Sequence, residues 1–204
     1  MKFLVVFILL CIFSGSLYSQ EIGVSAVKMW SDNYQLKNPA GFGFHIQLPV
    51  WKTAFRFQYT YAESKRDYYG FLLSGFLTEP SPQENVRSRS YMNSYDFQLM
   101  FPKLFSINKV VYFSLGLGLS WDTFEGNRTG LQSGRKYVLY AQTKNGIMYA
   151  AGISYERLFD LPLKLELMFR QKGLFGGVTV VDIEQPYGQA IGMTIIQFGT
   201  AFMF

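Results

Sequence analysis

Strict alternation between apolar and polar side chains is the feature that most limits how this chain can fold. The clearest run lies at residues 111–122, where every second residue from Val111 to Trp121 is apolar and the others are mostly small or polar. Successive side chains of a β-strand point to opposite faces, so this period predicts a strand with one apolar face. Such alternation recurs along the chain and helical periodicity is nearly absent, which predicts an all-β protein.

Eight runs of this kind are present, and each is long enough to form a strand. They lie at residues 22–30, 41–48, 55–61, 94–101, 111–122, 147–157, 163–170 and 190–204. The first, the sixth and the last of these runs alternate less regularly than the others.

The connections between the runs alternate between short and long. The short ones lie at residues 49–52, 102–109 and 159–162, and the long ones at residues 31–40, 63–90, 123–135 and 171–189. Short turns at one end and long loops at the other are typical of an up-and-down barrel. We therefore predict an eight-stranded antiparallel up-and-down β-barrel, with residues 136–147 as β-structure that protrudes beyond it.

Two features support ten strands instead of eight. Asn145-Gly146 is a dipeptide typical of two-residue hairpins, and residues 68–78 could form a further strand. Ten strands would make residues 123–135 a long connection at the end of the barrel where the other connections are short. For this reason we prefer eight strands.

The apolar faces can point inward, as in a soluble lipocalin-like ligand-binding barrel, or outward into lipid. The opposite faces carry charges of both signs, at Arg56, Asp96, Asp122, Glu156, Lys164, Glu166 and Arg170. An eight-stranded barrel is just wide enough to be filled by side chains, so these charges can pair as an interior network. We therefore expect the apolar faces to point outward, in a transmembrane barrel.

The composition supports this orientation. Aromatic residues make up 18% of the chain and charged residues only 16%, whereas soluble domains carry about a quarter charged residues. Trp30 and Trp121 lie at the ends of predicted strands, where outer-membrane barrels carry girdles of aromatic residues.

The last eight residues resemble the assembly signal of bacterial outer-membrane barrels, because Gln197, Gly199, Phe202 and Phe204 match its polar, glycine and hydrophobic positions. Over residues 20–204 the chain resembles the small outer-membrane β-barrel family of OmpX and the OmpA transmembrane domain. This resemblance implies a Gram-negative outer membrane, two periplasmic termini and a barrel-assembly machinery as a partner during biogenesis.

Residues 1–19 have the three parts of a secretory signal peptide. Lys2 is followed by an apolar run from Phe3 to Phe13 and by small residues up to Ser19, after which we predict cleavage. The end of this segment is similar to signal peptides of Bacteroidota. Since Cys11 is the only cysteine and lies within it, residues 20–204 form a barrel domain without disulfides.

No pattern indicates catalysis. His45 is the only histidine, and the residues after it do not give the His-x-Ser pair with which lipid A deacylases activate a serine. We predict that His45 is an interior packing residue. Because metal-ligand clusters, phosphate-binding loops and nucleotide motifs are missing, we expect no catalytic residue, cofactor or metal site.

The net charge of +5 is unevenly distributed. Residues 123–145 contain one acidic residue and four basic ones, at Arg128, Arg135, Lys136 and Lys144. A basic loop at the outer rim could contact lipopolysaccharide phosphates. A solvated loop with chance charge explains the same residues and is the interpretation we favour, and no nucleic-acid partner is expected.

The function that best fits these features is a non-enzymatic structural or surface-interaction role, adhesin-like, through the loops. The apolar segment from Tyr68 to Leu77 is the predicted contact with a surface partner. A small channel and a lipid-modifying enzyme are the alternatives. Side chains should fill an eight-stranded lumen, which argues against the channel.

Overall fold

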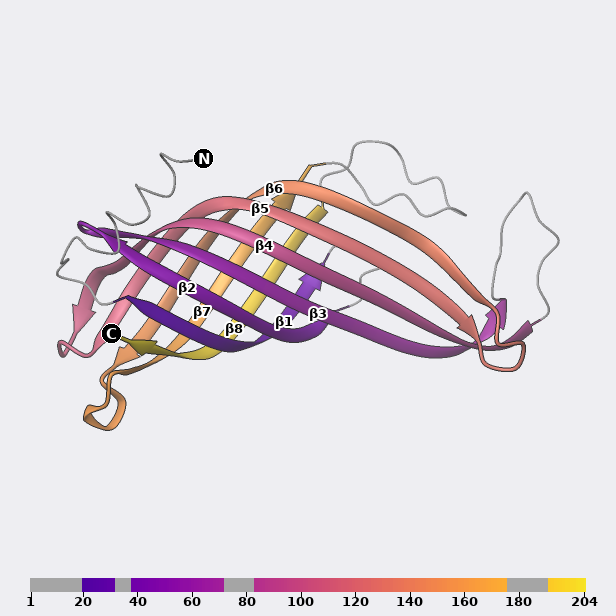
Figure 1. The fold of residues 1–204 in the computed structure, drawn as a ribbon, viewed down its shortest axis with the longest axis horizontal. Coiled ribbons are helices and arrows are strands. Elements are labelled where there is room, and N and C mark those ends of the chain that lie inside the picture. The colour runs from indigo at the N-terminus through magenta and orange to yellow at the C-terminus, as the bar shows by residue number, and fades with distance from the viewer. Residues whose placement is uncertain (1–19, 32–37, 72–82, 176–190) are drawn as a thin grey trace.

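The computed structural model describes residues 20–31, 38–71, 83–175 and 191–204 (Figure 1). The predicted signal peptide of residues 1–19 lies outside them and stays a prediction. The elements are β1 (Glu21–Ser31), β2 (Ala40–Val50), β3 (Thr53–Phe71), β4 (Gln83–Ile107), β5 (Val111–Gly130), β6 (Lys136–Glu156), the short 3-10 helix η1 (Leu158–Asp160), β7 (Leu163–Leu174) and β8 (Ile191–Met203).

The eight strands close into a barrel in which every strand pairs antiparallel with its neighbours in sequence. Closure joins β1 to β8, in a register that runs from Glu21 opposite Met203 to Ser31 opposite Met193. Backbone hydrogen bonds of 3.0 Å in both directions between Gln20 and Phe204 hold the beginning and the end of the barrel domain together. The eight-stranded prediction is confirmed, and the ten-stranded alternative is wrong.

Asn145-Gly146 does not form a turn. Asn145 lies opposite Trp121 and Gly146 lies opposite Ser120, both within the continuous pairing of β5 with β6. The ladder of cross-strand hydrogen bonds on either side overrides the local turn preference of this dipeptide, because strand structure depends more on context than on intrinsic propensity.

Four strands, β3 to β6, continue well beyond the ends that the alternation predicts, and β7 continues for four residues beyond Arg170. β3 and β4 stay paired as far as Phe71 opposite Gln83, and β5 and β6 stay paired beyond Glu125 opposite Ala141. The predicted loops at residues 63–90 and 123–135 are therefore wrong in large part, and so is the predicted turn at residues 102–109, since β4 runs to Ile107. The protruding β-structure predicted for residues 136–147 is present as the first half of β6.

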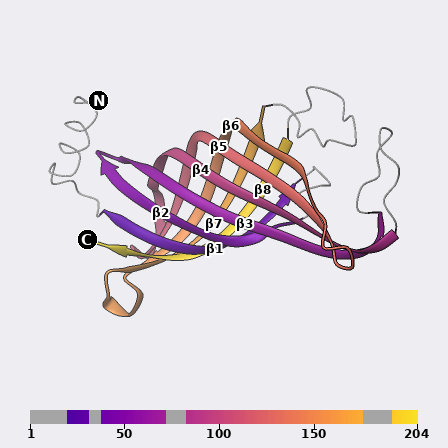
Figure 2. The ribbon, with the colours of Figure 1, turned by 45° about the vertical axis from the view of Figure 1, so that its right-hand side comes forward.

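The part of β3–β6 beyond the rung formed by Glu63, Tyr91, Glu125 and Ala141 is called the extension sheet here, and it comprises residues 63–71, 83–91 and 125–141. It spans eight residue steps along β3, or about 26 Å at the usual rise of a strand. Figures 1 and 2 show it as a curved sheet that arches past the ends of β1, β2, β7 and β8, at the opposite end from the C-terminus.

The wall of the barrel is apolar outside and mostly polar inside. Along β1 every second residue from Glu21 to Met29 is buried, and those between are exposed. The outward set on β5 is apolar from Val111 to Trp121 and includes Leu117, which is 63% exposed. The lipocalin-like alternative, with the apolar faces inward, is therefore wrong. The part of the chain that the structure describes contains no helix long and apolar enough to cross a bilayer.

An arginine on the outer wall should show where the lipid-facing band lies. Leu117 is halfway between Phe113 and Trp121, so we expect Leu117→Arg to lower the free energy of unfolding by about 2–4 kcal/mol, the cost of a cation near the bilayer midplane. Val138 is 62% exposed but lies in the extension sheet, so Val138→Arg should change it by less than about 0.5 kcal/mol. Denaturant titration in phospholipid vesicles measures both, and equal losses would contradict this placement of the band.

Candidate functional site

Two clusters of paired charges fill the polar part of the lumen. In the first, called the lower cluster, Arg56 donates two hydrogen bonds of 2.8 Å to the carboxylate of Glu166. Lys164 lies 2.5 Å from the Glu21 carboxylate and 3.3 Å from that of Glu166. All four side chains are buried, and two cations balance two anions.

The second cluster, called the central cluster, lies further along β7 toward the extension sheet. Arg170 Nη1 is 2.5 Å from one oxygen of Asp96, and Lys172 Nζ is 2.5 Å from the other. Lys172 also pairs with Asp122 at 3.0 Å and donates to the hydroxyl of Ser120, which in turn donates to Asp122. This cluster is also fully buried and electrically balanced, with two cations and two anions.

The sequence predicts six of these eight charges on the inward face, but it does not predict Glu21 and Lys172. Lys172 falls in a predicted loop because the clear alternation ends at Arg170, whereas β7 continues to Leu174. Glu156, predicted to belong to the network, lies outside both clusters. It pairs instead with Lys103 at 2.8 Å, near the turns at the terminal end of the barrel.

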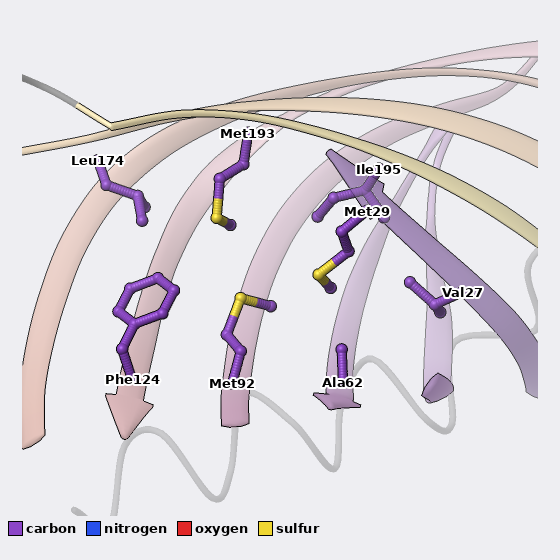
Figure 3. Close-up of a cluster of buried hydrophobic side chains, with 8 residues drawn as sticks. All are labelled: Val27, Met29, Ala62, Met92, Phe124, Leu174, Met193 and Ile195. Carbon is purple, nitrogen blue, oxygen red and sulfur yellow. The ribbon is translucent and has the colours of Figure 1, made fainter. Parts of the chain in front are cut away.

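An apolar layer closes the lumen on the side of the extension sheet. Figure 3 shows its members, which come from six strands: Val27, Met29, Ala62, Met92, Phe124, Leu174, Met193 and Ile195. A smaller apolar cluster of Ala54, Met100, Ala150 and Met168 lies on the terminal side. These inward apolar residues were not predicted, because alternation alone indicates which side chains point inward but not that some of them are apolar.

The methionines of the barrel domain all lie in its interior. All seven methionines that follow Met1 are buried, and each residue is 9% exposed or less. An unbranched, flexible thioether can fill irregular gaps between other side chains. The lumen is therefore packed with paired charges and with side chains that adapt to the remaining space.

His45 is buried inside the barrel, as expected of a packing residue, and is only 1% exposed. A Cβ atom at Gly23 would lie 2.3 Å from His45 Cε1, so the absence of a side chain at Gly23 makes room for the imidazole. Neither ring nitrogen has a hydrogen-bond partner among the described residues. Those residues also include no group of three or more His, Cys, Asp or Glu that could hold a metal ion.

The extension sheet carries most of the excess charge. It contains seven basic residues and four acidic ones, a net charge of +3. The rest of residues 20–204 contains eleven basic and ten acidic residues, a net charge of only +1. The barrel domain thus balances its charges in the lumen and leaves them unbalanced in the extension sheet.

The four basic residues predicted to contact lipopolysaccharide do not share one face. Lys136 and Arg128 occupy adjacent rungs and opposite faces of the extension sheet, and Arg135 belongs to the turn between β5 and β6. Lys144 lies opposite Asp122, nearer the barrel. Of the predicted contact segment, only Tyr68 to Phe71 is described, as the end of β3, and the remainder lies outside the described residues.

The turn that ends the extension sheet is held by one carboxylate. Glu84 accepts hydrogen bonds from the backbone N–H of Ser133 at 2.9 Å, from the Ser133 hydroxyl at 2.7 Å and from the Gln132 N–H at 3.0 Å. These bonds favour the ionised carboxylate and hold the pKa of Glu84 below its ordinary value. They tie β4 to the β5–β6 turn.

Three residues of the predicted assembly signal lie in β8, and the fourth, Phe204, directly follows it. Gln197 points inward and accepts a 2.7 Å hydrogen bond from Gln58. Gly199 allows close packing, since a Cβ there would lie 2.4 Å from the carbonyl oxygen of Val24. Phe202 and Phe204 are exposed on the outer wall with their ring centroids 6.2 Å apart. Their recognition by an assembly machinery stays a prediction.

No protein-family model matches the chain, and no curated protein matches it in sequence. Solved structures do resemble it. Neisserial surface protein A is 17% identical with a TM-score of 0.57, over 91% of this chain and 97% of that one. OprG from Pseudomonas aeruginosa is 9% identical with a TM-score of 0.56, over 92% and 97%.

Ail from Yersinia pestis, in complex with the heparin analogue sucrose octasulfate, is 14% identical with a TM-score of 0.50, over 91% of this chain and 97% of that one. At these identities the similarity concerns the fold. The chain therefore has the fold of the small outer-membrane β-barrels, and the predicted transmembrane barrel is confirmed.

Removing one charge from the central cluster should be costly. Asp96→Asn leaves Arg170 and Lys172 with one carboxylate between them, so we expect the free energy of unfolding to fall by about 3–5 kcal/mol. The double variant Asp96→Asn/Lys172→Met restores the balance of charge and should lose less than the sum of the two single variants. Denaturant titration of all three in vesicles tests the coupling, and additive losses would show that the pairing is unimportant.

Proposed function

We propose that this protein is a surface-interaction protein of the bacterial outer membrane, with periplasmic termini and with the extension sheet at the cell surface. In this proposal the packed barrel is the membrane anchor, and the extension sheet is the part that contacts a partner. The positive charge of the sheet suits an anionic partner, since oppositely charged surfaces attract and orient each other.

The extension sheet itself is the observation that supports this proposal. Among the described residues, β3 has no partner on β2 beyond Glu63, and β6 has none on β7 before Gly146. Four strands therefore continue past the barrel as a sheet whose two edges pair with no described strand, although closing the barrel does not require the four strands to be so long. Ordered strands at the surface offer a more rigid contact face than loops of the same length.

The known structures are compatible with this role. Ail binds a sulfated sugar in its crystal structure, so a barrel of this fold can carry a polyanionic ligand. For this chain, a sulfated polysaccharide is accordingly a suitable first probe of the extension sheet.

Trimming the extension sheet tests the role directly. Glu63 lies opposite Tyr91, and Glu125 lies opposite Ala141, so an Asn-Gly turn can join each pair in place of the residues between. We expect nanodiscs that carry the full chain to be retained on immobilised heparin in a salt-dependent way, and nanodiscs with the trimmed protein to pass through.

A heat-dependent shift of the trimmed protein in gel electrophoresis should show that the barrel still folds. Neutral dextran on the same support controls for adsorption. Equal retention of the trimmed and full proteins would contradict the proposal.

A channel is the competing function, and the packing of the lumen opposes it. The lower and central clusters leave no excess charge to attract an ion. The apolar layer that includes Met92 and Phe124 lies across the lumen between these clusters and the extension sheet. We expect planar bilayers containing the folded protein to show no unitary conductance steps in molar potassium chloride. Reproducible steps, with a size that follows the salt concentration, would favour the channel instead.

A further inference from the structure

One rung of the extension sheet brings two arginines to the same face. Arg66 of β3 lies opposite Ser88 of β4, which lies opposite Arg128 of β5. Their positions alternate with the outward residues, so all three belong to the face that continues the inner wall of the barrel. Adjacent strands lie about 4.8 Å apart, which places the Cα atoms of the two arginines about 10 Å apart with the serine between them.

Neither arginine has an ion-pair partner among the described residues. The acidic residue on this face of the extension sheet is Glu84, and its carboxylate is already occupied by Gln132 and Ser133. Asp67 belongs to the other face, where Arg87 binds it with two hydrogen bonds of 2.9 Å. The two arginines on the inner face are thus uncompensated, in contrast to every charge of the two lumen clusters.

Arg128 is also held in position and lacks an acceptor. Its guanidinium carbon lies 5.9 Å from the centroid of the Tyr68 ring, a cation–π contact that limits the freedom of the side chain. Its Nε is buried without a hydrogen-bond partner among the described residues. A buried donor without an acceptor is costly, and a ligand oxygen would satisfy it.

The chemistry of these groups specifies the ligand. A guanidinium offers paired N–H donors that match two oxygens of a phosphate or sulfate group, and a serine hydroxyl adds a further donor. Two arginine side chains that start about 10 Å apart can reach one tetrahedral anion between them. The Glu84 bonds to the neighbouring turn keep β4 and β5 in place, which lowers the entropy lost on binding.

We propose that Arg66, Ser88 and Arg128 form a binding site for a phosphate or sulfate group on a larger surface molecule. The proposal rests on the proposed function and makes it more specific, since it names the residues and the ligand group. The group could belong to a sulfated polysaccharide or to the phosphorylated sugars of lipopolysaccharide in the same membrane. Both present a tetrahedral group of anionic oxygens.

The outer face of the same strands provides a matched control. Lys65 and Arg89 lie opposite each other, next in sequence to Arg66 and Ser88, and their side chains belong to the opposite face. Lys65→Gln/Arg89→Gln and Arg66→Gln/Arg128→Gln each remove two positive charges from the extension sheet. Only the second variant removes the site.

Binding of a heparin hexasaccharide to the full chain in zwitterionic nanodiscs, measured by calorimetry in 150 mM salt, separates the two faces. We expect Arg66→Gln/Arg128→Gln to raise Kd at least about tenfold, the loss of several charge-assisted hydrogen bonds, and Lys65→Gln/Arg89→Gln to raise it less than about threefold. Arg66→Lys/Arg128→Lys keeps the charge without the paired donors and should recover only part of the affinity.

The source of the anion is found with labelled protein. A shift of the Arg128 Nε–H NMR signal on adding the hexasaccharide indicates a soluble polysaccharide, and the same shift in nanodiscs that contain lipopolysaccharide alone indicates the membrane lipid. Either result supports the site, and no shift with either probe overturns it.

The failure of this site and of the proposed function can be told apart. If the two glutamine variants weaken binding equally, or if Arg66→Gln/Arg128→Gln leaves it unchanged while trimming abolishes it, the site is wrong and the surface role stands. If the trimmed protein binds the hexasaccharide as the full chain does, both are wrong.

Discussion

Arg56 and Glu166 face each other across the lumen from strands that stand on opposite sides of the barrel, β3 and β7. Side chains alternate along a strand, so a slip of one residue would turn either charge toward lipid. A cation on the lipid side costs a few kcal/mol, and it would leave a buried carboxylate unpaired as well. The ion pair therefore contributes to specifying the register of both strands, and Arg170 with Asp96 does the same for β7 and β4.

A lumen organised in this way leaves little freedom for function inside the barrel. Its charged side chains form ion pairs with one another, and methionine and small residues fill the remaining space. The extension sheet follows the opposite rule, since it carries a net charge of +3 where water can solvate it. Balanced charges in the lumen and an excess of positive charge on the extension sheet suit a barrel that anchors a binding surface.

The sequence alone predicts the barrel and its inside face, because the period of two is a direct consequence of strand geometry. It also places Arg56, Glu166, Asp96 and Arg170 inside, since opposite charges on the face away from lipid need each other. It does not reveal which charges pair, because strands distant in sequence face each other only in the closed barrel. Lys172 shows the limit of prediction from alternation, because it lies just past the last clear alternation and yet belongs to the central cluster.

The sequence pattern does not predict the extension sheet, for a different reason. Both of its faces meet water, so apolar residues need not alternate with polar ones from Ser88 to Ser90 or from Ser64 to Asp67. The strands are evident only from their pairing. The Asn145-Gly146 dipeptide gives a wrong turn prediction, because its local turn preference is weak beside a strand pairing that continues on both sides of it.

The charges of the extension sheet also oppose aggregation through its exposed strand edges. Exposed edges invite pairing with other chains, and lysine or arginine on an edge strand opposes it. This accounts for Lys65 and Arg66 on the edge strand β3 and for Lys136 on the edge strand β6. It does not account for Arg128, which lies on β5 between two paired neighbours and points its guanidinium over the Tyr68 ring. A positive charge that has no counter-ion among the described residues protects no edge there, and the anion site proposed above accounts for its position.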